Sequence, residues 1–351
     1  MAVEIIGLDI GTSSMKLVCL NRTKKLTSLK SFAIIPLPPE SIVDGALMNT
    51  SAISESLVKI LKEIKVKTKK VALSISGHSV FVRFIRTSIT EDDALEEHIK
   101  WDAESYIPVN INDVYIDFQK LTTIPDQSGE IEVLLVAAKR NMVDEYDQLI
   151  KSIGLKPVIV DIDAFALQNV YEFNYPDRFD VENVVIVNIG SATTNINIIE
   201  KGISKFVRDI TIGGMEITEA VSQYYGLSVE EAENIKLGAM HGETNLVNPK
   251  ELHSIYEDVA TRIAGEIRQT IDYYRSQAAG DDIDRMYLSG GGAKVELITR
   301  MLADMLEVRV EYLNPFNNIN IDPKLFNIDF IRENGILASV AVGLALRKVE
   351  Y

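Results

Sequence analysis

One short pattern occurs twice in this chain, and it constrains the fold more than any other feature. The first copy covers residues 7–18 and reads GLDIGTSSMKLV, and the second covers residues 187–198 and reads VNIGSATTNINI. Each copy is typical of a β-hairpin whose turn holds a glycine and small hydroxyl residues. A glycine lets backbone N–H groups converge, and convergent N–H groups bind anions. Two copies in 351 residues therefore predict two related halves that grip a polyphosphate from both sides.

Length and composition agree with two lobes. A chain of 351 residues is too long for one ordinary core, so we expect lobes at 1–180 and 181–351. The apolar fraction of 46% is enough to form sizeable cores. The net charge of −15 excludes a broad nucleic-acid footprint, which requires a basic face. It also argues against direct adsorption to anionic lipid.

The sequence predicts a cytosolic protein. Cys19 is the one cysteine, and it lies on a predicted strand, so a buried core thiol is expected rather than a reactive one. No apolar run approaches the ~18 residues of a membrane span, and the N-terminus lacks a signal-peptide pattern. We therefore expect no membrane insertion, and any association with a membrane should come through a partner.

Hydrophobic periodicity predicts how the halves are organised. Helices are expected at about 50–64 and 251–277, from apolar residues spaced by three and four. The stretch at about 80–155 has its own strands and helices, so it is interpreted as a small α/β insertion in the first half. A nearly all-apolar final helix is expected at 334–347.

Two residues beside the first hairpin turn have alternative interpretations. Asp9 ends the first strand, and a carboxylate beside phosphates makes chemical sense if Mg²⁺ intervenes. Lys16, on the returning strand, could neutralise phosphate charge. Taken alone, Asp9 fits a strand-end turn equally well, and Lys16 fits a solvated lysine better.

Three further motifs in the second half could contact a nucleotide. Gly213-Gly214 opens a helix after a strand, which suits an anion or simply a turn. Gly290-Gly291-Gly292 is best explained by a flat ligand lying against bare backbone, since three glycines are costly to order. Glu233 and Lys236 share one helix face, as a surface ion pair or as ribose and base contacts.

These motifs occur in the order typical of one superfamily. The chain resembles the actin-like ATPases over essentially its whole length, which implies an α/β fold of two lobes around a nucleotide cleft. Within that superfamily it is most similar to the PilM family of type IV pilus assembly. The narrower resemblance rests on the insertion at about 80–155, on residues 162–168 (IDAFALQ) and on a chain that stops without an amphipathic tail.

The resemblance implies ATP held between the lobes, with Asp9 acting through Mg²⁺ and water. It assigns the remaining contacts to the two hairpins and the later motifs: Gly11, Thr12, Ser13, Ser14, Lys16, Asn188, Gly190, Ser191, Ala192, Thr193, Gly213, Gly214, Met215, Glu233, Lys236, Gly290, Gly291 and Gly292.

One position departs from the superfamily. Asn188 stands where the second hairpin usually carries an aspartate that helps to hold metal or position water. A neutral amide does neither as well, so ATP binding is expected with slow or absent hydrolysis, and no catalytic residue is assigned.

The resemblance also implies partners. PilM-like proteins bind the cytoplasmic N-terminal tail of the inner-membrane protein PilN in a groove beside the insertion, a peptide-in-groove mode. Other pilus platform or motor proteins and self-association are further expectations. The alternatives are a filament-forming ATPase like FtsA or MreB, or a sugar-kinase-like phosphotransferase.

Overall fold

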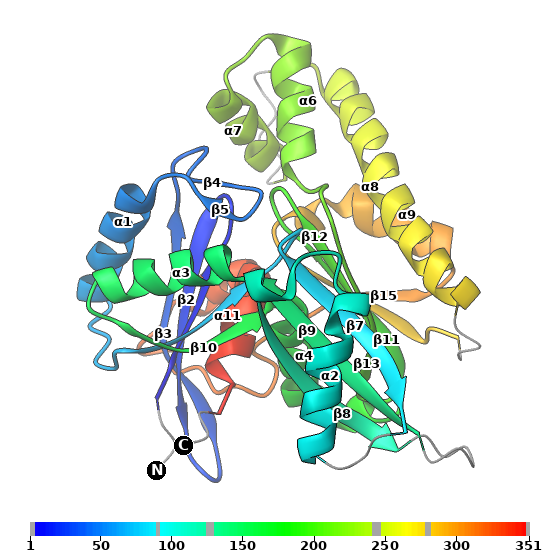
Figure 1. The fold of residues 1–351 in the computed structure, drawn as a ribbon. Helices are drawn as coiled ribbons and strands as arrows, with labels where there is room; N and C mark the ends of the chain where they lie inside the picture. The colour runs from blue at the N-terminus through cyan, green and yellow to red at the C-terminus, as the bar shows by residue number, and fades with distance from the viewer. Residues whose placement is uncertain (1–3, 89–91, 124–129, 241–246, 278–281, 349–351) are drawn as a thin grey trace.

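Two five-stranded sheets of identical connectivity form the frame of the molecule (Figure 1). The computed structural model describes residues 4–88, 92–123, 130–240, 247–277 and 282–348. The first sheet has the order β10-β6-β1-β2-β3 and the second β13-β12-β11-β14-β15. The first comprises β1 (Ile6–Ile10), β2 (Ser14–Arg22), β3 (Thr27–Pro36), β6 (Lys70–Ile75) and β10 (Lys156–Ile162). The second comprises β11 (Asn183–Ile189), β12 (Thr194–Glu200), β13 (Ile203–Ile210), β14 (Arg285–Ser289) and β15 (Arg309–Tyr312).

Strand directions repeat as well as strand order. In each sheet three successive strands form an antiparallel meander, a later strand pairs in parallel with the first of them, and a further strand pairs in parallel with that later strand. Each copy of the duplicated sequence pattern is the first hairpin of its sheet. The repeat in the sequence therefore marks a repeated supersecondary unit.

Amphipathic helices cover the outer faces of both sheets. Ile53 and Leu57 of α1 are fully buried, on the face predicted from their spacing. The first lobe also contains α3 and the short hairpin β4–β5, and the second carries α6 to α9. These elements are α1 (Thr50–Glu63), β4 (Ile42–Val43), β5 (Ala46–Leu47), α3 (Arg140–Ser152), α5 (Pro176–Phe179), α6 (Met215–Tyr225), α7 (Val229–Met240), α8 (Pro249–Gln277), η2 (Gly292–Lys294) and α9 (Glu296–Leu306).

A shared core joins the lobes through two helices, α4 (Asp163–Asn174) and α11 (Ser339–Ala345). Both pack against apolar side chains from the two sheets together. The approach is close: a β-carbon at Gly7 would lie 2.0 Å from Ala341 O, and one at Gly343 would lie 1.8 Å from Ala166 O. Glycine is needed at both points because no side chain fits between these backbones.

The final helix predicted at 334–347 is not continuous. The chain forms α10 (Ile328–Asn334), a 3₁₀ turn η3 (Gly335–Ala338) and then α11. The carbonyl of Ile336 accepts hydrogen bonds from Gly290 N at 3.3 Å and from Ser289 Oγ at 3.2 Å. Because this carbonyl serves β14 and the glycine turn, it is withdrawn from a regular helical ladder.

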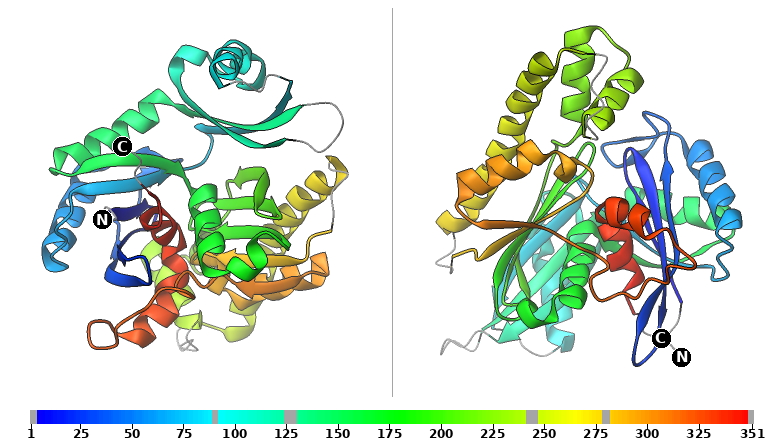
Figure 2. Two further views of the ribbon diagram at one scale, coloured as in Figure 1. Left: turned by 90° about the horizontal axis from the view of Figure 1, so that it is seen from below. Right: turned by 180° about the vertical axis from the view of Figure 1, so that it is seen from behind.

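A separate small unit lies beside the first lobe, seen clearly from below (Figure 2). Its sheet has the order β7-β9-β8, is covered by α2 and has its own core. The strands and helices are β7 (Val80–Thr87), α2 (Asp92–Tyr106), η1 (Ile111–Asp113), β8 (Val114–Thr123) and β9 (Ile131–Lys139). This unit is shorter than the insertion expected at about 80–155, because α3 buries its apolar face in the core of the first sheet.

The outer edge of the first sheet is covered by the chain itself. After β15 the chain returns to the first lobe, where Asn320 lies beside Ser28 of β3 in a parallel bridge. Asn320 N donates to Thr27 O, and Leu29 N donates to Asn320 O, both at 2.9 Å. Strand β3 therefore has hydrogen-bonding partners on both sides at this point.

Candidate functional site

The first hairpin turn presents backbone donors above an ion pair. Gly11 N donates to Ser14 O at 3.2 Å, which closes the turn and occupies that N–H group. The N–H groups of Thr12 and Ser13 have no acceptor among the described residues. Below them Lys16 Nζ lies 3.4 Å from Asp9 Oδ2 and 3.2 Å from Ser14 O. The turn can thus offer two donors to an anion, with one carboxylate and one ammonium beside it.

The second hairpin repeats the turn with neutral side chains. Gly190 N donates to Thr193 O at 2.9 Å, and no described acceptor faces the N–H groups of Ser191 and Ala192. Asn188 Nδ2 donates to Asn195 Oδ1 at 2.9 Å, across the same register position that Asp9 and Lys16 occupy in the first hairpin. An amide pair therefore replaces the ion pair.

The glycine pair before α6 is fastened to the second turn. Gly214 N donates to Gly190 O at 2.9 Å, and Met215 N donates to Ser191 O at 2.8 Å. A β-carbon at Gly213 would lie 2.5 Å from Ser191 O, so this contact requires glycine. The two motifs, separate in the sequence, are one backbone surface.

Lys236 supports that surface from below. Its buried Nζ donates to Gly214 O at 3.2 Å and Thr218 Oγ1 at 2.9 Å, and it lies 2.6 Å from Glu233 Oε2. These three contacts use all three N–H donors of the ammonium group. Lys236 therefore supports the backbone of Gly214 in this structure, and its contact with a base stays a prediction. The side chain of Glu233 is the more exposed of the two.

The three consecutive glycines have different surroundings. A β-carbon at Gly290 would lie 2.3 Å from Ile189 O, and one at Gly292 would lie 2.4 Å from Ile189 Cγ2. A β-carbon at Gly291 would meet no described atom within 4 Å, and its φ of −68° is open to any residue. Two of the glycines are thus required by packing, whereas Gly291 borders open space.

The structure brings the predicted residues of the second lobe into one group. The glycine pair, the second turn, Lys236 and Gly292 all touch at Gly214. The predicted residues of the first lobe form their own group at the β1–β2 turn. Both hairpins end on the same side of the molecule, below α6 and α7, as two views show (Figures 1 and 2).

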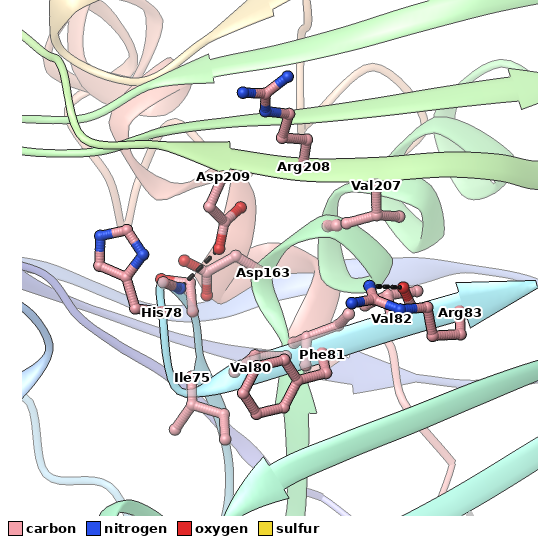
Figure 3. Close-up of a pocket in the computed structure, with 14 residues that line it drawn as sticks. Ile75, His78, Val80, Phe81, Val82, Arg83, Asp163, Val207, Arg208 and Asp209 are labelled. Carbon is pink, nitrogen blue, oxygen red and sulfur yellow. Dashed lines mark hydrogen bonds between the residues drawn. The ribbon is translucent and has the colours of Figure 1, made fainter. Parts of the chain in front are cut away.

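A second site, whose lining residues the sequence did not reveal, is a cavity of about 240 Å³ where the lobes meet the inserted unit (Figure 3). Its walls are the start of β7, the loop after β6, the junction of β10 with α4, and the end of β13. Strands β7 and β13 lie side by side here, yet each pairs with a neighbour on its other side only. We call this cavity, between two strand edges, the interlobe groove.

Two carboxyl groups, of Asp163 and Asp209, point into the interlobe groove (Figure 3). Burial raises the pKa of Asp163 to about 7, and the negative charge of Asp9 adds to this, against a hydrogen bond from Ser74 Oγ at 2.5 Å. Burial also raises the pKa of Asp209, although Asn195 Nδ2 at 2.8 Å and Gly77 N at 2.6 Å both donate to it.

Some of these residues could have been found from the sequence. Asn195 follows from the hairpin itself, because the closed turn places it opposite Asn188. Asp163 lies in the segment 162–168 that carried the family resemblance, but no role was attached to it. Asp209 carries no local signal, since its partners are 14 and 132 positions away.

Comparison with known proteins identifies the family. A family described as type IV pilus assembly protein PilM matches residues 7–349. The chain belongs to the PilM family. A solved PilM-PilN type IV pilus biogenesis complex has a chain 29% identical to this PilM family member, with a TM-score of 0.88 and 100% of both chains covered.

Two more distant relatives agree with the actin-like fold. MreB5 of Spiroplasma citri, solved with ADP, is 14% identical, with a TM-score of 0.55 over 97% of this chain and 94% of that chain. Cell division protein FtsA of Bacillus subtilis is 20% identical over 361 residues, covering 91% of this chain and 80% of FtsA. Membership of the PilM family favours pilus assembly over the FtsA-, MreB- and sugar-kinase-like alternatives. Among the described residues, no helix is long and apolar enough to cross a membrane.

Proposed function

We propose that this protein is an ATP-binding scaffold of type IV pilus assembly that binds the cytoplasmic N-terminal tail of a PilN-like inner-membrane protein. The proposal places the tail in the interlobe groove. Family membership and the likeness to a chain solved in a PilM-PilN complex support the partner class. The protein would then reach the inner membrane through that partner.

The observation that carries this proposal is the pair of facing strand edges. An extended peptide can add to an exposed edge through main-chain hydrogen bonds, while pockets select its side chains. The cavity of about 240 Å³ is smaller than the ~300–1,000 Å³ of typical small-molecule sites. It therefore suits a few residues of an extended chain better than a cofactor.

A matched pair of neighbouring substitutions tests the docking site. Val207 and Arg208 both belong to the lining of the groove, but the exposed side chain of Arg208 points away from Val207 and Asp209 (Figure 3). Val207→Trp should fill the groove and weaken binding of a synthetic tail peptide at least tenfold, or about 1.4 kcal/mol. Arg208→Trp should weaken peptide binding much less, because the altered side chain points away from Val207 and Asp209 (Figure 3). Equal affinities for both variants by calorimetry would place the tail elsewhere.

The proposed nucleotide site uses the paired turns. The free N–H groups of Thr12, Ser13, Ser191 and Ala192 would hold phosphates, and Gly291 would face the adenine. No three His, Cys, Asp or Glu side chains gather as metal ligands in the described part of the chain. A single carboxylate, Asp9, fits Mg²⁺, which keeps several waters and commonly uses one or two carboxylates with substrate phosphates. Bound Mg²⁺ would neutralise phosphate charge.

The glycine turn provides a test with an internal control. Gly291→Val should abolish ATP binding and leave thermal unfolding unchanged, because its side chain would enter open space. Gly292→Val should lower the unfolding temperature, because it collides with Ile189. Unchanged ATP affinity in a folded Gly291→Val protein would give the turn a purely structural role.

Slow or absent hydrolysis is part of the proposal. The Asn188 amide already donates to Asn195, and an amide cannot accept a proton from water. A well-placed catalytic base contributes roughly 10²–10⁴-fold. We expect turnover below about 1 per second, the lower end for ordinary enzymes. A faster steady-state rate would make the protein a true ATPase.

A further inference from the structure

A chain of hydrogen bonds runs from the second hairpin to the first lobe. Asn188 Nδ2 donates to Asn195 Oδ1 at 2.9 Å, and Asn195 Nδ2 donates to Asp209 Oδ1 at 2.8 Å. The other oxygen of Asp209 accepts from Gly77 N, in the loop after β6, at 2.6 Å. Both oxygens of Asp209 accept hydrogen bonds here, so Asp209 sets the orientation of the Asn195 amide, which in turn sets that of Asn188.

The two ends of this chain lie at different proposed sites. Asn188 borders the glycine turn, because a β-carbon at Gly290 would lie 2.8 Å from its Oδ1. At the other end, Asp209 and Gly77 line the interlobe groove. Asn195, in the middle, is 3% exposed and borders neither the groove nor the glycine turn. Its amide is thus the link between them.

A second connection runs parallel to the first. His78 Nε2 and Thr211 Oγ1 are 3.0 Å apart, which joins the loop after β6 to the end of β13. From there Thr194 Oγ1 donates to Ile212 O at 2.7 Å, and Gly214 N donates to Gly190 O. The end of β13 is therefore fixed to the groove on one side and to the second turn on the other.

We propose that Asn195 is a positioning residue that couples the second nucleotide turn to the interlobe groove, so that ATP and the partner tail strengthen each other's binding. The inference rests on the proposed function. Each ligand would order the same lobe junction, so the second to bind loses less freedom. Linkage requires the effect to be reciprocal, and typical couplings are about 5-fold to 150-fold.

The test is calorimetry on the full chain with a synthetic peptide of the PilN-like tail, with and without Mg²⁺-ATP. In the unaltered protein ATP should lower the Kd of the peptide at least 5-fold. In Asn195→Ala the ratio of the peptide Kd without ATP to that with ATP should be near one. Each ligand alone should still bind within about threefold of its affinity for the unaltered protein. If that variant fails to fold, Asn195→Ser is the second variant, because its short hydroxyl cannot reach both partners.

A control separates coupling from loss of a buried amide. Asn183, on β11, is also buried, but its amide donates to Asp282 O at the far end of the sheet, at 3.3 Å. Asn183→Ala should keep the full ratio. A ratio of one in the unaltered protein, or a full ratio in Asn195→Ala, would overturn the inference. Failure of either ligand to bind the unaltered protein would overturn the proposed function and the inference together.

Discussion

The two hairpins have the same backbone arrangement and differ in the chemistry of their side chains. Both turns close through the same glycine N–H bond, and the same register position in each carries a polar pair. In the first lobe that pair is Asp9 with Lys16, which keep charge next to the turn. In the second it is Asn188 with Asn195, which pass hydrogen bonds inward to Asp209. One copy of the repeat thus keeps charged side chains beside its turn, while the polar pair of the other copy is hydrogen-bonded to the interior.

The largest expected effect is on stability, through Asp163, which lies near both copies. Its pKa of about 7 is far above the ordinary 3.8, so between these values the folded state holds a proton that the unfolded chain releases. Stability should therefore fall as the pH rises from about 4 to about 7. The shift corresponds to about 4 kcal/mol.

Thermal unfolding across that pH range would measure this effect, with Asp163→Asn as the variant that removes it. The comparison sharpens with two more variants. Asp9→Asn should lower the Asp163 pKa more than Asp209→Asn does, because Asp9 contributes more to raising it. If the unfolding temperature of the unaltered protein does not fall anywhere between about pH 4 and pH 7, the raised pKa of Asp163 is contradicted.

The next effect concerns nucleotide affinity. Asp9→Ala should weaken ATP binding in Mg²⁺ about 10-fold to 100-fold, as expected for loss of an interaction of about 1.5–3 kcal/mol with a charged group. The loss should be smaller in EDTA, since the contact runs through the metal. Asn188→Ala should weaken ATP binding less than tenfold, and by the same factor in Mg²⁺ and in EDTA. Asp9→Ala losing the same affinity with and without Mg²⁺ would remove the distinction between the hairpins.

The smallest effect comes from making the second hairpin resemble the first. Asn188→Asp removes the donor to Asn195 and places two acceptors together, which should destabilise the fold by about 1–2 kcal/mol. Adding Asp209→Asn lets the amide of Asn195 turn round and restores a donor for each acceptor. Chemical denaturation of both single variants and the double variant gives the coupling energy. If the losses in free energy of unfolding of the two single variants simply add in the double variant, the hydrogen bonds from Asn188 to Asp209 are not coupled.

The sequence could predict the features that follow from local and repeated patterns. It missed the features that depend on contacts between residues far apart in the chain. The two turns, the strand register and the buried face of α1 follow from local patterns. The break at Ile336 does not, because the residues that take its carbonyl lie on β14 and in the glycine turn. Two further features could be recognised only in the folded chain. One is that the donors of Lys236 are all occupied, and the other is which residues line the interlobe groove. Asp209 was missed for the same reason, since one of its donors lies on strand β12 and the other in the loop after β6.

The difference between covered and unpaired strand edges has a consequence for how the protein is produced in a cell. Strand β3 is covered by Asn320 of the same chain, whereas β7 and β13 each leave one side unpaired beside a cavity. Unpaired edges are templates for aggregation. A cell that synthesises this chain in excess of its partner would accumulate molecules with two uncovered edges. Solubility during overproduction should therefore improve when the partner tail is co-expressed, and balanced synthesis of the two proteins would protect the chain from misassembly.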